Sequence, residues 1–270
     1  MAETRTDTIV ETQQDGHCLW ITLNQPEKRN ALSSAMLAAL SDALSQAYDD
    51  PQTRIIIITA KGPVFSAGHD LAEMSPKTDE SKQTRDQRVK NILQQCATMM
   101  MGIVNAPKPV IACVQGTATA AGCQLVSACD LAIADSAAQF CTPGVNIGIF
   151  CTTPLVGIGR NVSRKHAMEM ALTGDMFSAE QAQSFGLINR HVASAALMAE
   201  TKALAEKIAS RSAQGIRAGK AAFYHQIDLP LAEAFAYANE EMRCAVTSEG
   251  DAIEGTAAFL EKRAPKWGDA

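Results

Sequence analysis

The run RIIIIT at residues 54–59 places four consecutive isoleucines in the chain and is the first indication of its fold. Apolar residues without alternation predict a strand buried on both faces, as in a parallel sheet covered by helices. Residues 110–114 and 131–134 have the same character. Earlier, residues 9–13 and 18–23 predict two strands joined through Asp15-Gly16, a hairpin signal. Strands that alternate with turns and helices predict an α/β fold with right-handed crossovers.

Helical segments divide the chain into two parts. Ser33 is suited to cap a helix with an apolar face, and polar residues 75–88 predict a mobile surface loop. After about Ser194 only helices are expected, over 197–210, 214–224, 230–247 and 249–263. We therefore expect an α/β core over residues 1–194 and a helical region over residues 195–270, which is suited to oligomer formation.

Composition limits the partners and the compartment. The chain has 270 residues, a net charge of -5 and 47% hydrophobic residues, of which few are aromatic. The chain has no block of basic residues of the kind that binds nucleic acid, and no apolar run reaches the roughly 18 residues of a membrane span. The eight cysteines form no C-x-x-C pair, so we expect no metal site and a reduced compartment. The N-terminus is polar, without the apolar core of a signal peptide, and a cytoplasmic protein is expected.

Two segments of small residues follow predicted strands. Residues 65–70 follow the isoleucine strand after a turn at 61–63, and residues 116–122 follow strand 110–114 and open a helix. Ala67 and Gly68 leave the backbone uncovered, and a helix N-terminus presents free N–H groups. Two such loops can direct two donors at one developing oxyanion. Small residues here also serve tight packing of a helix against a strand, so the segments alone do not decide.

The order of several separated motifs decides the family. These motifs are Asn30-Ala31-Leu32, residues 65–70, residues 109–112, residues 120–124, Cys129-Asp130, Ala179-Glu180 with Gly186-Leu187, and residues 254–263. Together they resemble the enoyl-CoA hydratase/isomerase (crotonase) family from about residue 9 to 267. Residues 142–146 are most similar to a divergent branch, the enoyl-CoA hydratase domain-containing proteins.

The resemblance implies a fold, a substrate class and an assembly. The fold is a spiral of repeated β-β-α units with a C-terminal helical region that makes trimers. The substrates are acyl-CoA thioesters, so coenzyme A belongs to the substrate and no cofactor is permanently bound. A homotrimer or a dimer of trimers is expected, without nucleic acid or membrane.

The resemblance also assigns roles to individual residues. It makes the N–H groups of His69 and Ala121 the two oxyanion donors. The positions that meet the adenosine and phosphates of CoA, or that form the binding loop, are Lys28, Arg29, Ala31, Ala67, Asp70, Leu71 and Ala72.

The chain departs from the family where its hydratases carry two glutamates that position and activate water. Gln124 stands at the first position and Gly144 at the second, and a third acidic position falls near Thr152. General acid–base catalysis contributes roughly 100- to 10,000-fold, so ordinary hydratase activity is expected to be weak, altered or absent. If the motifs align as described, Gln124→Glu combined with Gly144→Glu is expected to raise hydratase activity.

Several alternatives remain open at this point. The His69 ring is a replacement catalyst, or only its backbone matters; Asp70 is more suited to cap a helix than to perform chemistry. Cys141, Cys151 or Thr152 could supply a nucleophile, although no partner base is evident. The protein is then an altered enzyme of the hydratase/isomerase type, a non-catalytic acyl-CoA binder or regulatory subunit, or a thioester hydrolase.

Overall fold

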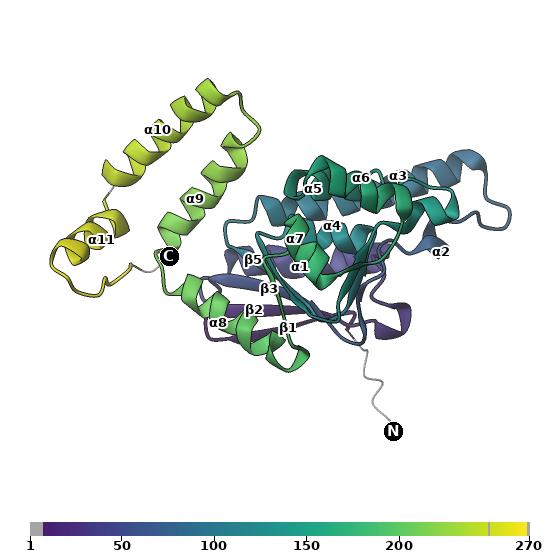
Figure 1. Ribbon diagram of the computed structural model, residues 1–270, viewed down its shortest axis with the longest axis horizontal. Coiled ribbons are helices and arrows are strands. Elements are labelled where there is room, and N and C mark those ends of the chain that lie inside the picture. The colour runs from purple at the N-terminus through teal and green to yellow at the C-terminus, as the bar shows by residue number, and fades with distance from the viewer. Residues whose placement is uncertain (1–7, 248, 269–270) are drawn as a thin grey trace.

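A six-stranded sheet forms the base of the molecule (Figure 1). The computed structural model describes residues 8–247 and 249–268, so the first seven residues of the polar N-terminus lie outside it. The sheet has the order β1 (Val10–Asp15), β2 (Cys18–Leu23), β3 (Ile55–Ala60), β5 (Val110–Val114), β7 (Leu131–Asp135) and β10 (Arg190–Val192). The predicted hairpin is confirmed, with Gly16 at a φ of 58° in its turn. Every other pair in the sheet is parallel.

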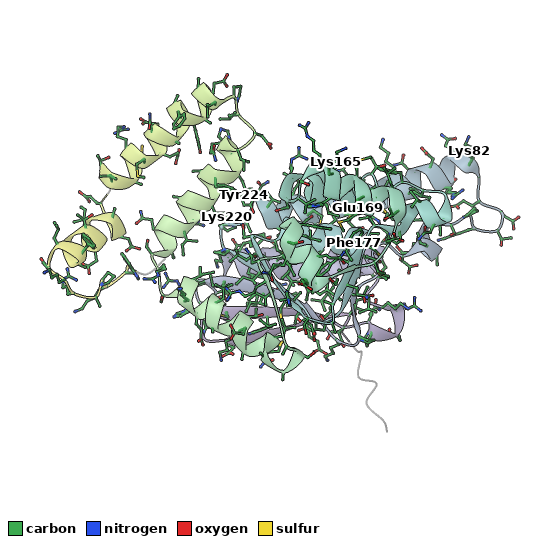
Figure 2. All side chains as sticks on the ribbon, in the orientation of Figure 1. Lys82, Lys165, Glu169, Phe177, Lys220 and Tyr224 are labelled. Carbon is green, nitrogen blue, oxygen red and sulfur yellow. The ribbon has the colours of Figure 1, made fainter. Side chains whose placement is uncertain are left out.

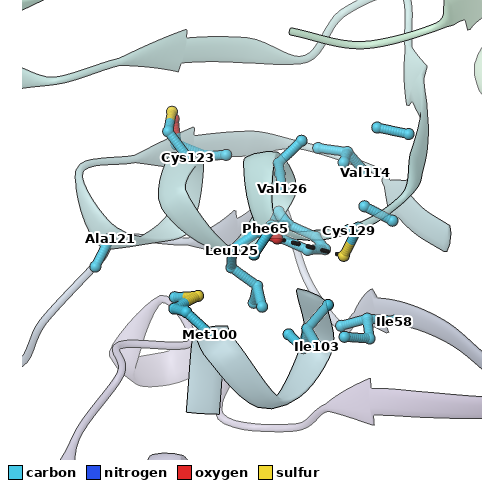
Figure 3. Close-up of a cluster of buried hydrophobic side chains, with 14 of the residues drawn as sticks. Ile58, Phe65, Met100, Ile103, Val114, Ala121, Cys123, Leu125, Val126 and Cys129 are labelled. Atoms are coloured by element: carbon cyan, nitrogen blue, oxygen red, sulfur yellow. Dashed lines mark hydrogen bonds between the residues drawn. The ribbon is translucent and has the colours of Figure 1, made fainter. Parts of the chain in front are cut away.

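The isoleucines of β3 point alternately to the two faces of this sheet. Ile56 and Ile58 pack with α1 (Ser34–Asp49), α3 (Lys82–Val104) and α4 (Ala121–Ala128), as the cluster in Figure 3 shows for Ile58. Ile55 and Ile57 pack beneath α8 (Leu197–Ala209). All four are at most 1% exposed, and burial of each contributes roughly 1.5–3 kcal/mol. The prediction of a strand buried on both faces is confirmed.

A second sheet gives the core its spiral form. It has the order β4 (Val64–Ser66), β6 (Thr117–Thr119), β8 (Gln139–Cys141) and β9 (Phe177–Ser178). Three times in succession the chain forms a strand of the first sheet, then a strand of the second, and then a helical segment. The predicted spiral of β-β-α units is therefore confirmed. The remaining helical segments of this part are η1 (Pro26–Lys28), α2 (Leu71–Met74), η2 (Pro143–Ile147), α5 (Pro154–Asn161), α6 (Arg164–Thr173), α7 (Ala179–Phe185) and η3 (Ser194–Ala196).

The polar segment 75–88 is only partly a loop. Ser81 caps α3, its hydroxyl accepting a hydrogen bond from the N–H of Thr84, so the second half of the segment is helical. Arg88 in the first turns of α3 pairs with Glu80 through two nitrogens and also donates to the carbonyl of Ser75. Arg88 thus ties the remaining loop to the helix. Because α3 begins within the segment, the prediction of a loop over all of it is wrong.

The C-terminal helices extend away from the core (Figure 1). They are α9 (Ala213–Gln226), α10 (Leu231–Thr247) and α11 (Asp251–Leu260), close to the predicted bounds. One lysine of α9, Lys220, is buried and donates to the Asp130 carboxylate at 2.7 Å and to the carbonyls of Ile103 and Lys108; Figure 2 labels it beside Tyr224. In the described part of the chain, no helix is long and apolar enough to cross a membrane.

Candidate functional site

The two small-residue segments meet at one edge of the second sheet. β4 and β6 are parallel neighbours, so the chain leaves both strands at the same edge. A Cβ atom at Gly68 would lie 2.9 Å from the carbonyl oxygen of Thr119 and 3.0 Å from the backbone nitrogen of Ala121. Glycine is required for this approach, and its φ of 81° is also one that glycine adopts readily. The structure therefore brings together the two segments that the sequence indicated.

Close packing explains two other glycines in these segments. A Cβ at Gly116 would collide with the carbonyl of Pro63, and one at Gly122 would collide with the carbonyl of Ser66. The alternative role of the small residues, tight helix–strand packing, is thus real at Gly122, where α4 meets β4, whereas Gly116 serves the close approach of the segments before β4 and β6. Gly68 differs because it holds the two loops against each other.

Hydrogen bonds hold the first loop in place and leave one of its backbone N–H groups without a partner among the described residues. Ala67 donates to the carbonyl of Arg29, and Leu32 donates to that of Gly68 at 2.7 Å. The Ser66 hydroxyl donates to the carbonyl of Asn30 and accepts from the N–H of Gly68. No hydrogen bond of the described residues uses the N–H of His69. This N–H is therefore available to a ligand.

The second loop ends in an unusual turn before α4. Ala120 has a φ of 48° and a ψ of −116°, donates to the carbonyl of Cys141 at 2.9 Å, and accepts from the N–H of Gln124. Ala121 is the first residue of α4, where backbone N–H groups have no partner within the helix and the helix dipole is positive. Its N–H is the counterpart of that of His69, across the contact made by Gly68.

Replacing Ala120 by glycine is expected to stabilise the protein. The backbone angles of Ala120 match the first central residue of a type II′ turn, which favours glycine, and a non-glycine residue there costs about 1–3 kcal/mol. The greater entropy of glycine in the unfolded chain offsets part of this gain. Ala120→Gly should therefore raise the free energy of unfolding by about 1 kcal/mol. Urea denaturation measures this. Ala121→Gly, at a helical position, should lower the free energy instead, and equal effects would contradict the strain.

The side chain of His69 is half-buried at the same edge. Its Nε2 atom is buried and has no hydrogen-bond partner among the described residues. Burial lowers the pKa of the ring, so the imidazole is neutral at pH 7. The neighbouring Asp70 accepts a hydrogen bond from the N–H of Ala72 and caps α2, as the sequence indicated. A catalytic role for the His69 ring and a role for its backbone alone both stay as alternatives.

Gln124 and Gly144 lie on the segments that follow. Gln124 is 8% exposed, and its Oε1 has no partner within the described part of the chain. Gly144 lies in η2, where its N–H donates to the thiol sulfur of Cys151 at 3.3 Å. A Cβ at Gly144 would collide with the carbonyl of Ile149 and lie 2.9 Å from the Cys151 sulfur. A glutamate does not fit there without movement of residues 149–151, so the expected gain from Gln124→Glu with Gly144→Glu is withdrawn.

The remaining predicted site residues lie around the first loop. Lys28 and Arg29 are exposed at the end of η1, and Arg29 has a φ of 53°. Ala31 and Ala67 are half-buried, whereas Leu71 and Ala72 are exposed on α2. Thr152 is exposed and hydrogen-bonds only to the carbonyl of Phe150.

Two residues of the site escaped the sequence analysis as individual sites. Asn30 is fully buried and donates to the carbonyls of Lys61 and Val64, which holds the first loop beneath η1. Thr142 is fully buried and its hydroxyl has no partner among the residues described. A polar residue before Pro143 was visible in the sequence, but nothing there indicated its burial.

The geometry defines what the site can do chemically. Among the residues that the structure describes, the N–H groups of His69 and Ala121 have no hydrogen-bond partner, and such a pair suits an oxygen that gains negative charge. No group of His, Cys, Asp or Glu side chains in residues 8–247 and 249–268 could hold a metal ion. A cavity of about 570 Å³ lies elsewhere, between α9 and the segment 107–109.

Comparison with known proteins gives a consistent picture. The family model described as enoyl-CoA hydratase/isomerase matches residues 13–270. Rat enoyl-CoA hydratase domain-containing protein 3, mitochondrial, is 46% identical over 96% of this chain and 84% of its own length. Two crystal structures are each 42% identical with a TM-score of 0.91: an enoyl-CoA hydratase from Mycobacterium smegmatis, over 97% of this chain and 99% of that one, and human enoyl-CoA hydratase domain-containing protein 3, over 96% and 100%.

The comparison corrects the expected compartment. The similar proteins from rat, mouse and human are named as mitochondrial, which contradicts the cytoplasmic location inferred from the sequence. Free, mostly buried cysteines fit any reducing environment and do not single out the cytosol.

Proposed function

The chain belongs to the enoyl-CoA hydratase/isomerase family, and on this premise we propose that it binds acyl-CoA thioesters, with the carbonyl oxygen between the N–H groups of His69 and Ala121. The observation that supports the proposal is the close approach of Gly68, the residue before His69, to Thr119 and to the backbone nitrogen of Ala121. Charge that develops on the oxygen in an enolate-like state is stabilised by two oriented donors in a site poor in water.

The chemistry that follows binding is limited by the groups around this pair. Gln124 is an amide and cannot act as a carboxylate base, and Gly144 has no side chain and no room for one. Hydration of an enoyl thioester is therefore expected to be slow or absent. A second candidate is a binder or regulatory subunit with the same pocket, favoured by this lack of acids. A third, thioester hydrolysis, rests on the free Nε2 of His69.

A panel of thioesters separates these functions. The protein is mixed with butyryl-CoA, trans-but-2-enoyl-CoA and 3-hydroxybutyryl-CoA, with binding followed by calorimetry and hydration and thiol release followed by absorbance. Micromolar binding without turnover supports the binder, and release of free CoA supports the hydrolase. If the protein binds none of these esters, all three functions are refuted.

Basic residues near η1 are expected to meet the phosphates of CoA. Charge reversal of both Lys28 and Arg29 to glutamate should weaken binding of butyryl-CoA about tenfold at low salt, and less at high salt, because exposed charges are screened. The matched control is Arg164→Glu with Lys165→Glu, a second adjacent exposed pair, on α6. Equal losses in both double variants would show a general charge effect and contradict the assignment.

The helical C-terminal region supports a further part of the proposal, assembly into trimers. Large apolar side chains on α9–α11 and in the turn after α9 are more than half exposed; they include Phe223, Ile227, Leu231, Phe235, Met242, Val246, Ile253, Phe259 and Leu260. A surface of this kind is covered in a stable soluble protein by another subunit. Sedimentation analysis of the full chain tests this, and a monomer at micromolar concentration would refute it.

A further inference from the structure

Three cysteines gather next to the second oxyanion donor, and we call them the thiol cluster: Cys123, Cys141 and Cys151. Cys123 lies in the first turn of α4 and donates to the carbonyl oxygens of Ala118 and Cys141. Cys123 thus contacts the strand residue Cys141, and three residues further on the N–H of Gly144 donates to the sulfur of Cys151 at 3.3 Å. Cys123 and Cys141 are fully buried, whereas Cys151 keeps 8% of its surface exposed. Cys151 is therefore the most exposed member of the cluster.

Cys151 occupies the space that a side chain at position 144 would need. Its sulfur lies 2.9 Å from the place of a Cβ on Gly144 and accepts a hydrogen bond from the N–H of Gly144 at 3.3 Å. Burial raises the pKa of the Cys151 thiol, and the hydrogen bond that its sulfur accepts from the N–H of Gly144 opposes that rise. Because Gly144 has no side chain, the Cys151 thiol occupies the space where that side chain would be. The N–H of Gly144 already donates a hydrogen bond to its sulfur.

Two buried polar atoms without partners lie beside the cluster. They are Oε1 of Gln124 and Oγ1 of Thr142, in residues that are 8% and 0% exposed. Gln124 shares a face of α4 with Ser127, which contacts Gly157 and Asn161 of α5. Gln124 therefore lies on the side of α4 that faces α5, the helix that begins three residues after Cys151. Buried polar groups are normally satisfied, so these atoms point to a ligand or water in this space.

From this placement, and resting on the proposed function, we propose that Cys151 is a nucleophile that captures α,β-unsaturated acyl thioesters by conjugate addition. The carbonyl oxygen held by His69 and Ala121 draws electrons from the conjugated double bond. A bond forms between the Cys151 sulfur and the β-carbon, the electron pair of the double bond moves toward the thioester oxygen, and the thiol proton ends on the α-carbon. The product is a thioether that retains the whole acyl-CoA, with no oxidant and no leaving group.

Intact-protein mass spectrometry tests the capture on the full-length protein. With trans-but-2-enoyl-CoA the chain should gain the mass of one complete ester, mapped by peptide sequencing to Cys151, whereas saturated butyryl-CoA should bind without any gain. Cys151→Ser should lose more than about nine-tenths of the adduct. Cys244→Ser is the matched control, because Cys244 is the exposed cysteine on α10 and should not matter.

A second measurement tests the role of Cys151 even if the Cys151→Ser variant fails to fold. In the wild-type protein, saturating butyryl-CoA should slow alkylation of Cys151 by iodoacetamide at least about tenfold, because the ligand covers the thiol. If neither ester binds, the proposed function fails. If both bind and no adduct or protection appears, only the role of Cys151 fails. A gain of the butenoyl group alone would show attack on the carbonyl and overturn conjugate addition.

Discussion

Gly68→Ala is expected to reduce the affinity for acyl-CoA about 100-fold and to lower the free energy of unfolding by about 2–3 kcal/mol. The new Cβ would lie 2.9 Å from the carbonyl oxygen of Thr119 and 3.0 Å from the nitrogen of Ala121, so the two loops must separate. The φ of 81° adds the cost of a left-handed conformation. Displacement of about 1 Å in a positioned site costs on the order of 100-fold.

The hairpin glycine provides a matched control for this substitution. Gly16 has a φ of 58°, and nothing lies within 4 Å of a Cβ placed there. Gly16→Ala therefore pays for the left-handed conformation, about 1 kcal/mol, without a collision. Calorimetric titration with butyryl-CoA and urea denaturation of both variants measure the two effects. If Gly68→Ala binds as well as Gly16→Ala, the donors do not depend on the contact of the loops.

Lys220→Met is expected to destabilise the protein by about 3–5 kcal/mol. The Lys220 side chain is 8% exposed and that of Asp130 16%, and the ammonium and carboxylate lie 2.7 Å apart. Removal of the lysine leaves a largely buried carboxylate that accepts a hydrogen bond from the N–H of Val110 and lies beside Tyr224 but has no cation, and an uncompensated buried charge is costly. The substitution also releases α9 from the carbonyls of Ile103 and Lys108. Denaturant titration followed by circular dichroism measures the loss.

Two further variants identify the origin of the loss at Lys220. Lys61→Met breaks a pair with Glu11 in which both side chains are more than 40% exposed, and it should cost less than about 1 kcal/mol. Asp130→Asn combined with Lys220→Met should be less destabilised than the sum of the single variants, since no charge remains buried. Additive single losses would indicate that packing, and not the charge pair, anchors α9.

Local signals in the sequence predicted much of the core. The isoleucine run, the Asp15-Gly16 turn, and the caps at Ser33 and Asp70 depend on neighbouring residues, and each has its expected structure. The start of α3 was missed because the cap at Ser81 stands within a polar stretch that has no apolar period.

Prediction of the site depended on which contacts the strands impose. The meeting of residues 65–70 with 116–122 was foreseen from the strands 55–59 and 110–114 that precede them, but the strands β4 and β6 within these segments were not predicted. The position of Cys151 against Gly144 depends on the path of residues 145–150, which no spacing rule fixes. For the same reason, the lack of room for a side chain at Gly144 could not be predicted. The combined substitution Gln124→Glu with Gly144→Glu was therefore expected to raise activity, although the structure rules it out.

The parallel order of the sheets has a consequence for the kinetics of folding. Gly68 and Ala121 follow different crossovers, and each crossover must close a long loop before its strand contributes favourable pairing. Neither loop can hold its donor until β4 and β6 are paired, because their contact begins where those strands end. Acyl-CoA binding should therefore be among the last properties to return on refolding, after helical circular dichroism. A partly folded chain, even one rich in helix, would not bind the ligand.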